Sequence, residues 1–327
     1  MGASATTTPE LYAMNGGDGR FGYAKNSFLQ GHDINASKGK ISEAIAEKLD
    51  LKVLLSTSKT IRIVDVGCSV GPNTFLAIQN IIESIERKQY FAAGVPGSFH
   101  GRLFPEGSIH VFYSSIALHI LSKVPEELLD KNSPSWNKGR IHYMNAPDEV
   151  VNAYATQYAK GIEIFLDARA KEMVCGGMAV MIFPANPTGI PYSQTFTGAM
   201  FELLESSLLD LAKEGKISEA QVDSFNLPMY VPSLEEMMEL VQKNGCFDIE
   251  KMELTSPGVH ASMTNTSSMG KAIVMHVRAG MERMLIQHFG SEIIDELFNR
   301  YAKKFEEFPH HVLPSKKVLL FVVLKRK

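Results

Sequence analysis

The sequence predicts an α/β fold with a mostly parallel sheet, helices on its faces and an antiparallel strand pair at the end of the chain. A short β-branched run at residues 61–66 is followed by two glycines and then by apolar residues at helical spacing, the pattern of a strand, a turn and a helix. Further apolar runs alternate with long helical patterns. The last two strand-like runs, at 247–254 and 318–324, are expected to pair antiparallel.

The first half of the chain contains three of the expected strands. Residues 1–20 are polar and rich in glycine, so we expect a flexible arm there. The elements that follow are an amphipathic helix near 36–50, the strand and helix of the glycine turn over 61–82, a loop at 94–99, a strand at 108–113, a long helix over 147–173 and a buried strand at 178–183.

The second half is dominated by helices. Ser233 with Glu236 forms the pattern of a capping box, and Asn244 with Gly245 is a stop signal, so a helix over 234–243 is predicted. Other helices are expected near 194–214, 217–223, 270–288 and 291–306. We interpret residues 1–327 as a single unit, with the core sheet at about 50–185 and 246–327 and helical cap insertions at about 190–245 and 265–305.

The composition excludes several classes of protein. The chain has 327 residues, 45% of them hydrophobic and 21% charged, which is ordinary for a globular protein. A formal net charge of −3 without a dense basic stripe gives no sign of nucleic acid binding. No apolar run is long enough to span a membrane, so no membrane partner is expected. The three cysteines, Cys68, Cys175 and Cys246, form no closely spaced pair, which indicates a reducing compartment, the cytoplasm.

The glycine turn carries the first indication of chemistry. Its pattern is Asp65-x-Gly67-x-x-x-Gly71 followed by Pro72, which differs from the Gly-x-Gly-x-x-Gly of dinucleotide enzymes. Asp65 ends the strand, where such sheets bind ligands, and an acidic group there suits a cation better than a phosphate. S-adenosylmethionine (SAM) carries a sulfonium and an ammonium and no phosphate. A methyl-donor site is the favoured interpretation, while another nucleotide, or a turn without a ligand, stays open.

Seven segments together resemble the plant SABATH methyltransferases, which methylate salicylic, benzoic, jasmonic and related acids and the caffeine precursors. The segments are residues 14–19, 23–30, 65–73, 94–105, 121–125, 137–139 and 223–228. The resemblance extends over nearly the whole chain. It implies a class I methyltransferase with a Rossmann-like sheet and a helical cap, SAM as the methyl donor, and a small, apolar plant carboxylic acid as the substrate. A homodimer is also expected.

By position, the resemblance assigns two groups of ligand-binding residues. The methyl-donor group consists of Tyr23, Ser27, Asp65, Cys68, Asn73, Ser98, Phe99, Ser115, Ile116 and Ala117. Gln30 matches the glutamine that hydrogen-bonds the substrate carboxylate, and Ile116, His119 and Ile120 line the acid pocket. No catalytic side chain is expected, because a carboxylate is already ionised, and so is already the nucleophile, at neutral pH.

A third group matches the magnesium positions of the family. Its members are Asn137, Asp223, Phe225 (through its backbone) and Asn226. A single carboxylate makes a weak magnesium site, and Asp223 with Asn226 can equally mark the passage from a loop to a helix. Ordinary structural roles are also open for the donor group: its serines and its asparagine can cap turns, and Cys68 can be a small buried apolar residue.

Two features differ from the family pattern, and the first concerns the sheet. The family has a further strand after the helix of the glycine turn, and the aspartate at the end of that strand holds the ribose hydroxyls of the donor. Here residues 86–91 lead almost directly into the loop at 94, and Glu83 and Glu86 lie on the helix instead. We therefore expect a sheet of the seven-stranded type reduced by one strand, and weak binding of the donor.

The second difference lies in the acid pocket. Ile116 stands where the family usually has tyrosine, and Ile120 stands where it has a tryptophan whose indole pairs with the glutamine. Isoleucine offers no hydrogen-bond donor, although His119 can donate unless it is an ordinary helix histidine. The two differences leave an alternative open, a catalytically impaired family member that survives as a non-catalytic dimer partner or as an unselected product.

Overall fold

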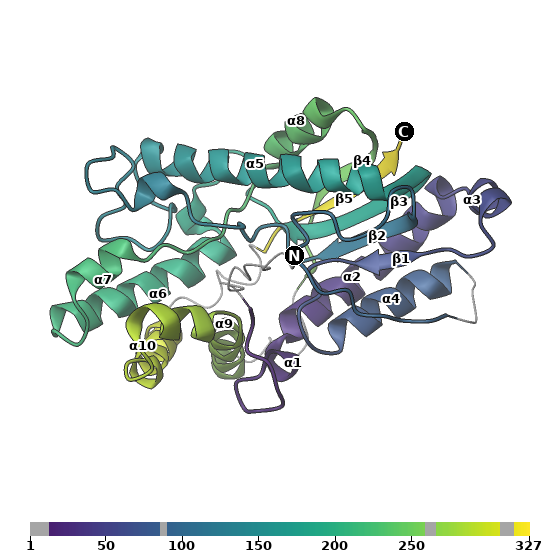
Figure 1. The fold of residues 1–327 in the computed structure, drawn as a ribbon. Coiled ribbons are helices and arrows are strands. Elements are labelled where there is room, and N and C mark those ends of the chain that lie inside the picture. Colours follow the sequence, from purple (N-terminus) through teal and green to yellow (C-terminus); the bar gives the residue numbers. More distant parts are fainter. Residues whose placement is uncertain (1–12, 86–89, 259–265, 308–316) are drawn as a thin grey trace, which may run out of the picture.

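The computed structural model describes residues 13–85, 90–258, 266–307 and 317–327, and within them the chain forms a five-stranded sheet flanked by helices (Figure 1). In their order across the sheet, the strands are β1 (Ile63–Asp65), β2 (Ile109–Ser115), β3 (Met173–Pro184), β5 (Leu319–Arg326) and β4 (Phe247–Thr255). β1, β2 and β3 are parallel, whereas β5 runs antiparallel to both of its neighbours. The predicted α/β class and the antiparallel terminal pair are confirmed.

The sheet has one strand fewer than predicted. Between α4 (Asn73–Ser84) and β2 the described residues contain no strand, so β1 forms the edge of the sheet. Residues 90–97 run there without regular structure, and the side chains of Tyr90 and Phe91 are exposed. An apolar segment becomes a strand where a neighbouring strand satisfies its backbone groups, and none pairs with it in the described part of the chain. The absence of a strand at this place agrees with the expectation, and the five strands found are those predicted from the local patterns. The count of six, taken from the seven-stranded type reduced by one, was one too high.

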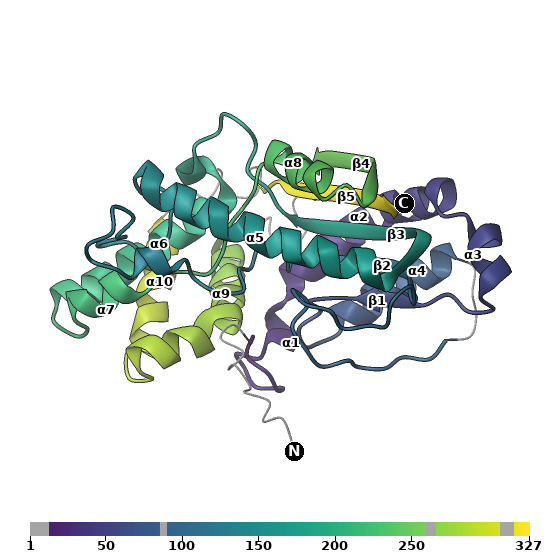
Figure 2. The same cartoon turned by 45° about the horizontal axis from the view of Figure 1, so that its top comes forward.

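Each face of the sheet carries its own apolar layer. Alternate residues of the central strands point to opposite faces, so Val111, Val180 and Phe321 lie in one layer and Phe112 and Met181 in the other. The helices that cover the two faces are α2 (Phe28–Lys48), α3 (Leu51–Thr57) and α4 on the first, and α5 (Asp148–Glu172) and α8 (Leu234–Asn244) on the second (Figure 2). Three short helical turns complete this part of the fold: α1 (Tyr23–Asn26), η1 (Glu126–Leu128) and η2 (Tyr192–Gln194).

The described end of the N-terminal arm is docked, not free. The backbone N–H of Asn15 donates to the carbonyl of Ala279 at 2.9 Å, and its side-chain amide donates to Glu282. The expectation of a flexible arm is therefore wrong for residues 13–20, and residues 1–12 lie outside the described part. The helix predicted near 36–50 begins earlier, at Phe28, because the buried face continues through Leu29.

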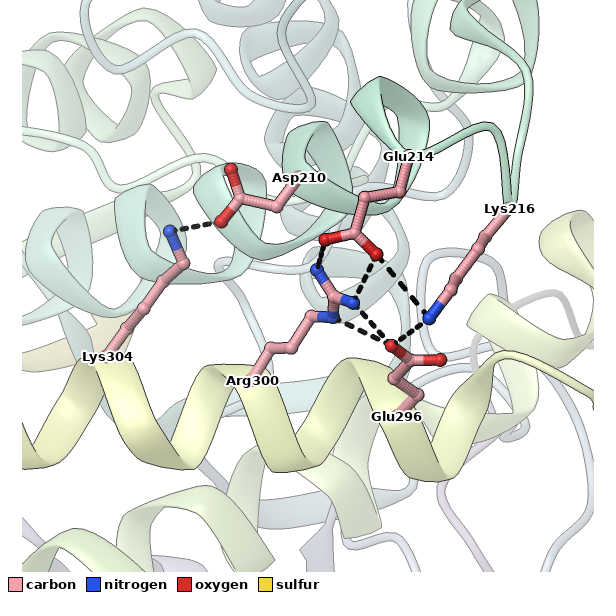
Figure 3. A network of polar contacts seen from close by, with 6 residues as sticks. All are labelled: Asp210, Glu214, Lys216, Glu296, Arg300 and Lys304. Atoms are coloured by element: carbon pink, nitrogen blue, oxygen red, sulfur yellow. Dashed lines mark hydrogen bonds and ion pairs between the residues drawn. The ribbon is translucent and has the colours of Figure 1, made fainter.

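A helical cap covers the carboxyl ends of the parallel strands (Figure 1). Its helices are α6 (Phe196–Lys213), α7 (Glu219–Ser224), α9 (Thr266–Phe289) and α10 (Ile294–Glu307). Arg300 joins α10 to the end of α6 through two hydrogen bonds of 2.7 Å to Glu214, and it also pairs with Glu296 in its own helix (Figure 3). Lys304 pairs with Asp210 at 2.7 Å, so the two helices are joined by charges along their length.

Predicted helix ends are recovered where the local sequence specifies them. α8 begins with the expected capping box of Ser233 and Glu236 and ends at Gly245, whose φ of 72° is the left-handed value that glycine adopts without strain. No helix among the described residues combines the length and the apolar character needed to cross a membrane.

Candidate active site

The glycine turn after β1 is packed too tightly for side chains. Gly67 has a φ of +73°, and a Cβ placed on it would lie 2.4 Å from the Cβ of Ala117 and 3.4 Å from the ring of Phe99. Gly71 has a φ of +123°, and its Cβ would lie 2.9 Å from the Cα of Ala24 in α1. The turn therefore brings the loop after β2, the loop at 98–99 and the first helix around one point. Most of the predicted donor residues lie in these segments.

Asp65 places a carboxylate at the carboxyl end of β1. It lies opposite Tyr113 of β2 in the parallel register, and it keeps partial access to solvent. Burial raises the pKa of its carboxyl group to about 7, and a hydrogen bond from Thr74 opposes the rise. Among the described residues no cation pairs with Asp65. A cationic ligand at this point would restore the ionised form, because an opposite charge nearby favours a charged carboxylate.

Ser27 and Asn73 hold α1 and α2 against the turn. The side-chain amide of Asn73 donates to the carbonyl and to the hydroxyl of Ser27, both at 3.0 Å. The structural alternative weighed for these two residues is thus compatible with their geometry. For Cys68 that alternative is wrong, because the thiol is exposed. Burial of Tyr23 raises the pKa of its hydroxyl, with the charge of Asp33 adding to the effect.

The loop that carries Ser98 and Phe99 is fixed by a buried ion pair that the sequence analysis missed. Arg169 of α5 donates to the carbonyl of Phe99 at 2.7 Å and to that of Gly101 at 2.8 Å. It also binds Glu172 at 2.7 Å, and Glu172 accepts from the backbone N–H of Phe104 at 2.9 Å. Both charged side chains are at most 1% exposed. Ser98 itself is exposed, so it is accessible to a ligand at this edge of the sheet.

The predicted acid-binding residues lie together in one cavity under the cap. Gln30 of α2 and Ile116, His119 and Ile120 from the segment after β2 line it. The rest of the wall is mainly apolar and comes from α2, α6, α9 and the segments before α8: Leu29, Phe196, Met200, Phe201, Met229, Val231, Val277 and Met281. Ile116 has a φ of 53°, a strained value for a β-branched residue, and strain of this kind concentrates at functional sites. Tyr23 also lines the cavity, so the acid pocket and the donor residues are continuous.

His276 of α9 orients Gln30, and the sequence analysis did not identify it. Its Nδ1 lies 3.1 Å from the carbonyl oxygen of Asn26 and must donate to it, which leaves Nε2 as an acceptor. The side-chain amide of Gln30 donates to that Nε2 at 3.3 Å. Burial lowers the pKa of His276 to about 4, so the ring is neutral at pH 7. The second N–H of Gln30 stays available for a ligand.

His119 is half-buried and neutral. Burial lowers its pKa to about 4, and His276 contributes to the effect. Its Nδ1 is buried and has no hydrogen-bond partner, like Oε1 of Gln30. Unpaired buried polar atoms are rare and costly in native structures, and ones that face a cavity indicate a ligand.

An ion pair of Asp33 and Lys317 completes the polar lining of the cavity. Nζ of Lys317 lies 2.7 Å and 2.6 Å from the two carboxylate oxygens of Asp33. Burial raises the pKa of Asp33, and the charge of Lys317 opposes the rise. The two residues are 284 positions apart, so no local pattern pointed to their contact.

The predicted metal residues form a buried polar cluster. Asn137 donates to the amide oxygen of Asn226 at 2.7 Å, and Asp223 accepts from the backbone N–H of Gly139 at 2.7 Å. Phe225 lies between Asp223 and Asn226 in the chain. Oδ1 of Asn137 is buried without a partner, and Asp223 is the one carboxylate of the predicted set, so these residues fit at most a weakly held Mg²⁺. Nowhere in the described residues do three His, Cys, Asp or Glu side chains form a metal-binding group.

Of the two acids expected on the helix after the glycine turn, Glu83 and Glu86, one lies among the described residues. Glu83 of α4 is exposed, and it pairs instead with Lys38 at 2.9 Å and with Gln79 at 3.0 Å. Glu86 lies outside the described residues. Within the described part of the chain, β1 is an edge strand that pairs with β2 on one side.

Comparisons with known proteins agree on one family. The sequence model described as SAM dependent carboxyl methyltransferase matches residues 9–89 and 83–327. Loganic acid O-methyltransferase of Catharanthus roseus is 42% identical, with 98% of this chain and 96% of the relative covered. Farnesoic acid carboxyl-O-methyltransferase of Arabidopsis thaliana is 33% identical over 97% and 99%. A solved structure of loganic acid methyltransferase with SAH (S-adenosylhomocysteine) superposes with a TM-score of 0.90 at 41% identity, covering 96% of this chain and 98% of that one.

The comparisons also mark where this chain is shorter. The two matched pieces of the family model meet at residues 83–89, at the end of α4. The alignment with the Catharanthus enzyme runs over 361 positions although this chain has 327 residues, so at least 34 aligned positions have no residue here. This agrees with the five-stranded sheet and its edge at β1.

Proposed function

The chain belongs to the SAM-dependent carboxyl methyltransferases of the plant SABATH family, and on this premise we propose how its site performs the reaction. The enzyme transfers the methyl group of SAM to the carboxylate of a small plant acid. The family model covers almost the whole chain, and its relatives include enzymes named for loganic and farnesoic acid. Nothing in the comparisons favours the alternative of a non-catalytic dimer partner or an unselected product.

Asp65 is the main support for the proposed donor site. An unpaired carboxylate with a raised pKa, beside a turn that only glycine can form, fits the ammonium of SAM. The remaining donor residues would surround the ligand: Tyr23, Ser27, Cys68, Asn73, Ser98, Phe99, Ser115, Ile116 and Ala117. Phe99 and Ser98 would contact the adenine, and Arg169 would keep their loop in place.

The protein promotes the reaction by aligning the substrate carboxylate with the methyl group of SAM. One carboxylate oxygen attacks the methyl carbon in line with the departing sulfur, the C–S bond breaks, and SAH leaves as the neutral thioether. The nucleophile is already ionised, so Gln30 needs only to orient it through its free N–H. Correct orientation of two reactants lowers a barrier by about 7–11 kcal/mol in the best cases. The neutral histidines and the apolar wall keep the cavity dry.

The pocket favours acids larger than salicylate. Ile120 gives no N–H to a carboxylate, so a small acid gains little beyond its remaining carboxylate contacts, whereas a larger apolar acid also gains from burial against the Met and Phe side chains. The test is methyl transfer from SAM to a panel of acids, with ester formation as the readout. We expect turnover of terpenoid-sized acids and poor turnover of salicylate. Fast reaction with salicylate would refute the specificity, and no ester from any acid would refute the function.

Four further properties are proposals. A weakly bound Mg²⁺ would be held by Asn137, Asp223, Phe225 and Asn226, and the unpaired Oδ1 of Asn137 supports this proposal. Magnesium should then raise the melting temperature of the wild type but not that of Asp223→Asn. Exposed apolar side chains near the β1 edge, such as Phe75 and Phe91, support a homodimer, which light scattering would measure. The free cysteines fit a reducing compartment, and we propose the cytoplasm. We also propose that the chain is divided into a core sheet and a helical cap.

A further inference from the structure

The acid pocket contains a charged pair that the proposed function does not use. Lys317, just ahead of β5, pairs with Asp33 of α2, and the exposed fractions of their side chains are 16% and 1%. A buried pair of this kind adds little net stability, because removing both charges from water costs about as much as their attraction returns. Its position in the wall of a ligand cavity therefore suggests a role in binding.

The ammonium of Lys317 has one more N–H donor than Asp33 has carboxylate oxygens. It carries three N–H donors, and Asp33, its partner among the described residues, offers two carboxylate oxygens. Because Lys317 lines the cavity, the third donor is within reach of a ligand there. Asp33 follows Gln30 by three residues in α2, a spacing that puts their Cβ atoms about 5–6 Å apart on one face of the helix. The ammonium and the amide of Gln30 thus serve neighbouring parts of one pocket.

Lys317 is also the cation that an acid would meet in this pocket. Its described lining contains two charged side chains, Asp33 and Lys317, and the rings of His119 and His276 are neutral at pH 7. A carboxylate that enters an apolar cavity without a charged or hydrogen-bonding partner loses much of its hydration energy. Ile120 supplies no N–H, so Gln30 alone would be a poor replacement for water.

We propose that Lys317 is the second anchor of the substrate carboxylate, acting with Gln30, and that Asp33 holds the ammonium in position. This assignment rests on the proposed function. The ammonium binds the charged acid more strongly than the neutral methyl ester, so the anchor weakens as the product forms. Asp33 keeps the pair neutral overall, which limits how far the ammonium withdraws charge from the nucleophile.

Two substitutions that break the same ion pair should have opposite effects on the acid. Lys317→Met removes the anchor, and we expect the KM for the acid to rise about 10- to 50-fold with little change in the affinity for SAH. Asp33→Asn removes the neutralising charge, while its amide oxygen can still accept from the ammonium and hold it in position, so the KM should fall about threefold or more at pH 6.5. Lys317→Arg is the matched control that keeps the charge, and its KM should stay closer to the wild type than that of Lys317→Met.

Melting temperature separates this role from a structural one. Both pair-breaking variants lose the same contact, so both should melt earlier by similar amounts. If the KM rises in both variants in parallel with the loss of stability, the pair is only structural and the proposal is overturned. Calorimetric titration of the acid into the SAH complex measures anchoring without turnover. Acid binding that Lys317→Met weakens would support the anchor even if no ester forms, in which case the proposed function alone would fail.

Discussion

The acid-binding and donor-binding halves of the site are built differently. The acid half lies between α2, α6 and α9, where His276 orients Gln30 and Asp33 holds Lys317. The donor half lies at the edge of the sheet, where β1 has no neighbour on one side among the described residues and where Tyr90 and Phe91 are exposed. The difference teaches that an edge strand can be absent while the central strands and the cap keep their arrangement, because each face of the sheet retains its own apolar layer.

The largest effect should come from the carboxylate that the donor half retains. Asp65→Asn removes the partner of the SAM ammonium, and a hydrogen bond to a charged group is worth about 1.5–3 kcal/mol, or about 10- to 150-fold in affinity. Calorimetric titration with SAH measures the loss. Glu83→Gln is the control, because Glu83 pairs with Lys38, and it should bind SAH like the wild type. Equal losses in the two variants would show that Asp65 has no special place in the donor half.

The pH dependence of donor binding should be nearly as large. In the free protein the pKa of Asp65 is raised to about 7, so the carboxyl group is mostly protonated at pH 6 and mostly ionised at pH 8. The ammonium of SAH binds the ionised form, which lowers that pKa in the complex. Affinity should therefore increase about tenfold from pH 6 to pH 8, with a proton released on binding below pH 7. A flat profile would contradict this reading of Asp65.

The acid half should respond to a restored donor. Ile120→Trp adds an indole N–H beside Gln30, and we expect turnover of small aromatic acids such as salicylate to rise about 5- to 10-fold, as one hydrogen bond would give. Ile120→Leu is the matched control, since it changes shape without adding a donor, and it should leave the preference among acids unchanged. If leucine raises salicylate turnover as much as tryptophan does, cavity shape and not hydrogen bonding sets the specificity.

The smallest effect belongs to the ion pairs of the cap. Arg300→Gln removes the link from α10 to Glu214, and we expect the melting temperature to fall by about 1–4 °C. The fall should be smaller at high salt, because salt screens ion pairs that are accessible to solvent. Lys59→Gln, at an exposed lysine, should change little. Affinity for SAH should be unaffected in both variants; a large loss in Arg300→Gln would mean that the cap supports the donor half.

Local patterns in the sequence predicted the donor half best. Asp65 and the glycines after it form one continuous motif, and the capping box of α8 fixed a helix end. The five strands found are the five that local patterns predicted, whereas the count of six was taken from the seven-stranded type of the family and was one too high. Secondary structure at a sheet edge depends on the neighbouring strand, which a local pattern does not report.

Contacts between distant residues determine the rest of the acid half. His276 meets Gln30 across 246 positions, and Lys317 meets Asp33 across 284. A lone histidine or lysine in a sequence has no feature that marks it as a pocket residue. Periodicity did predict that α9 is a helix, yet only the packing of the cap shows which of its side chains faces the cavity.

The most direct test of the account compares SAH with its 2′-deoxy analogue. The central claim is that the donor half keeps Asp65 for the ammonium and has no carboxylate for the ribose among its described residues. Calorimetry should therefore give this enzyme nearly equal affinities for the two ligands, within about threefold. The Catharanthus loganic acid enzyme, as a reference with the longer chain, should lose about 10- to 150-fold with the deoxy analogue. An equally large loss in this enzyme would contradict the claim, because another group would then be holding the ribose.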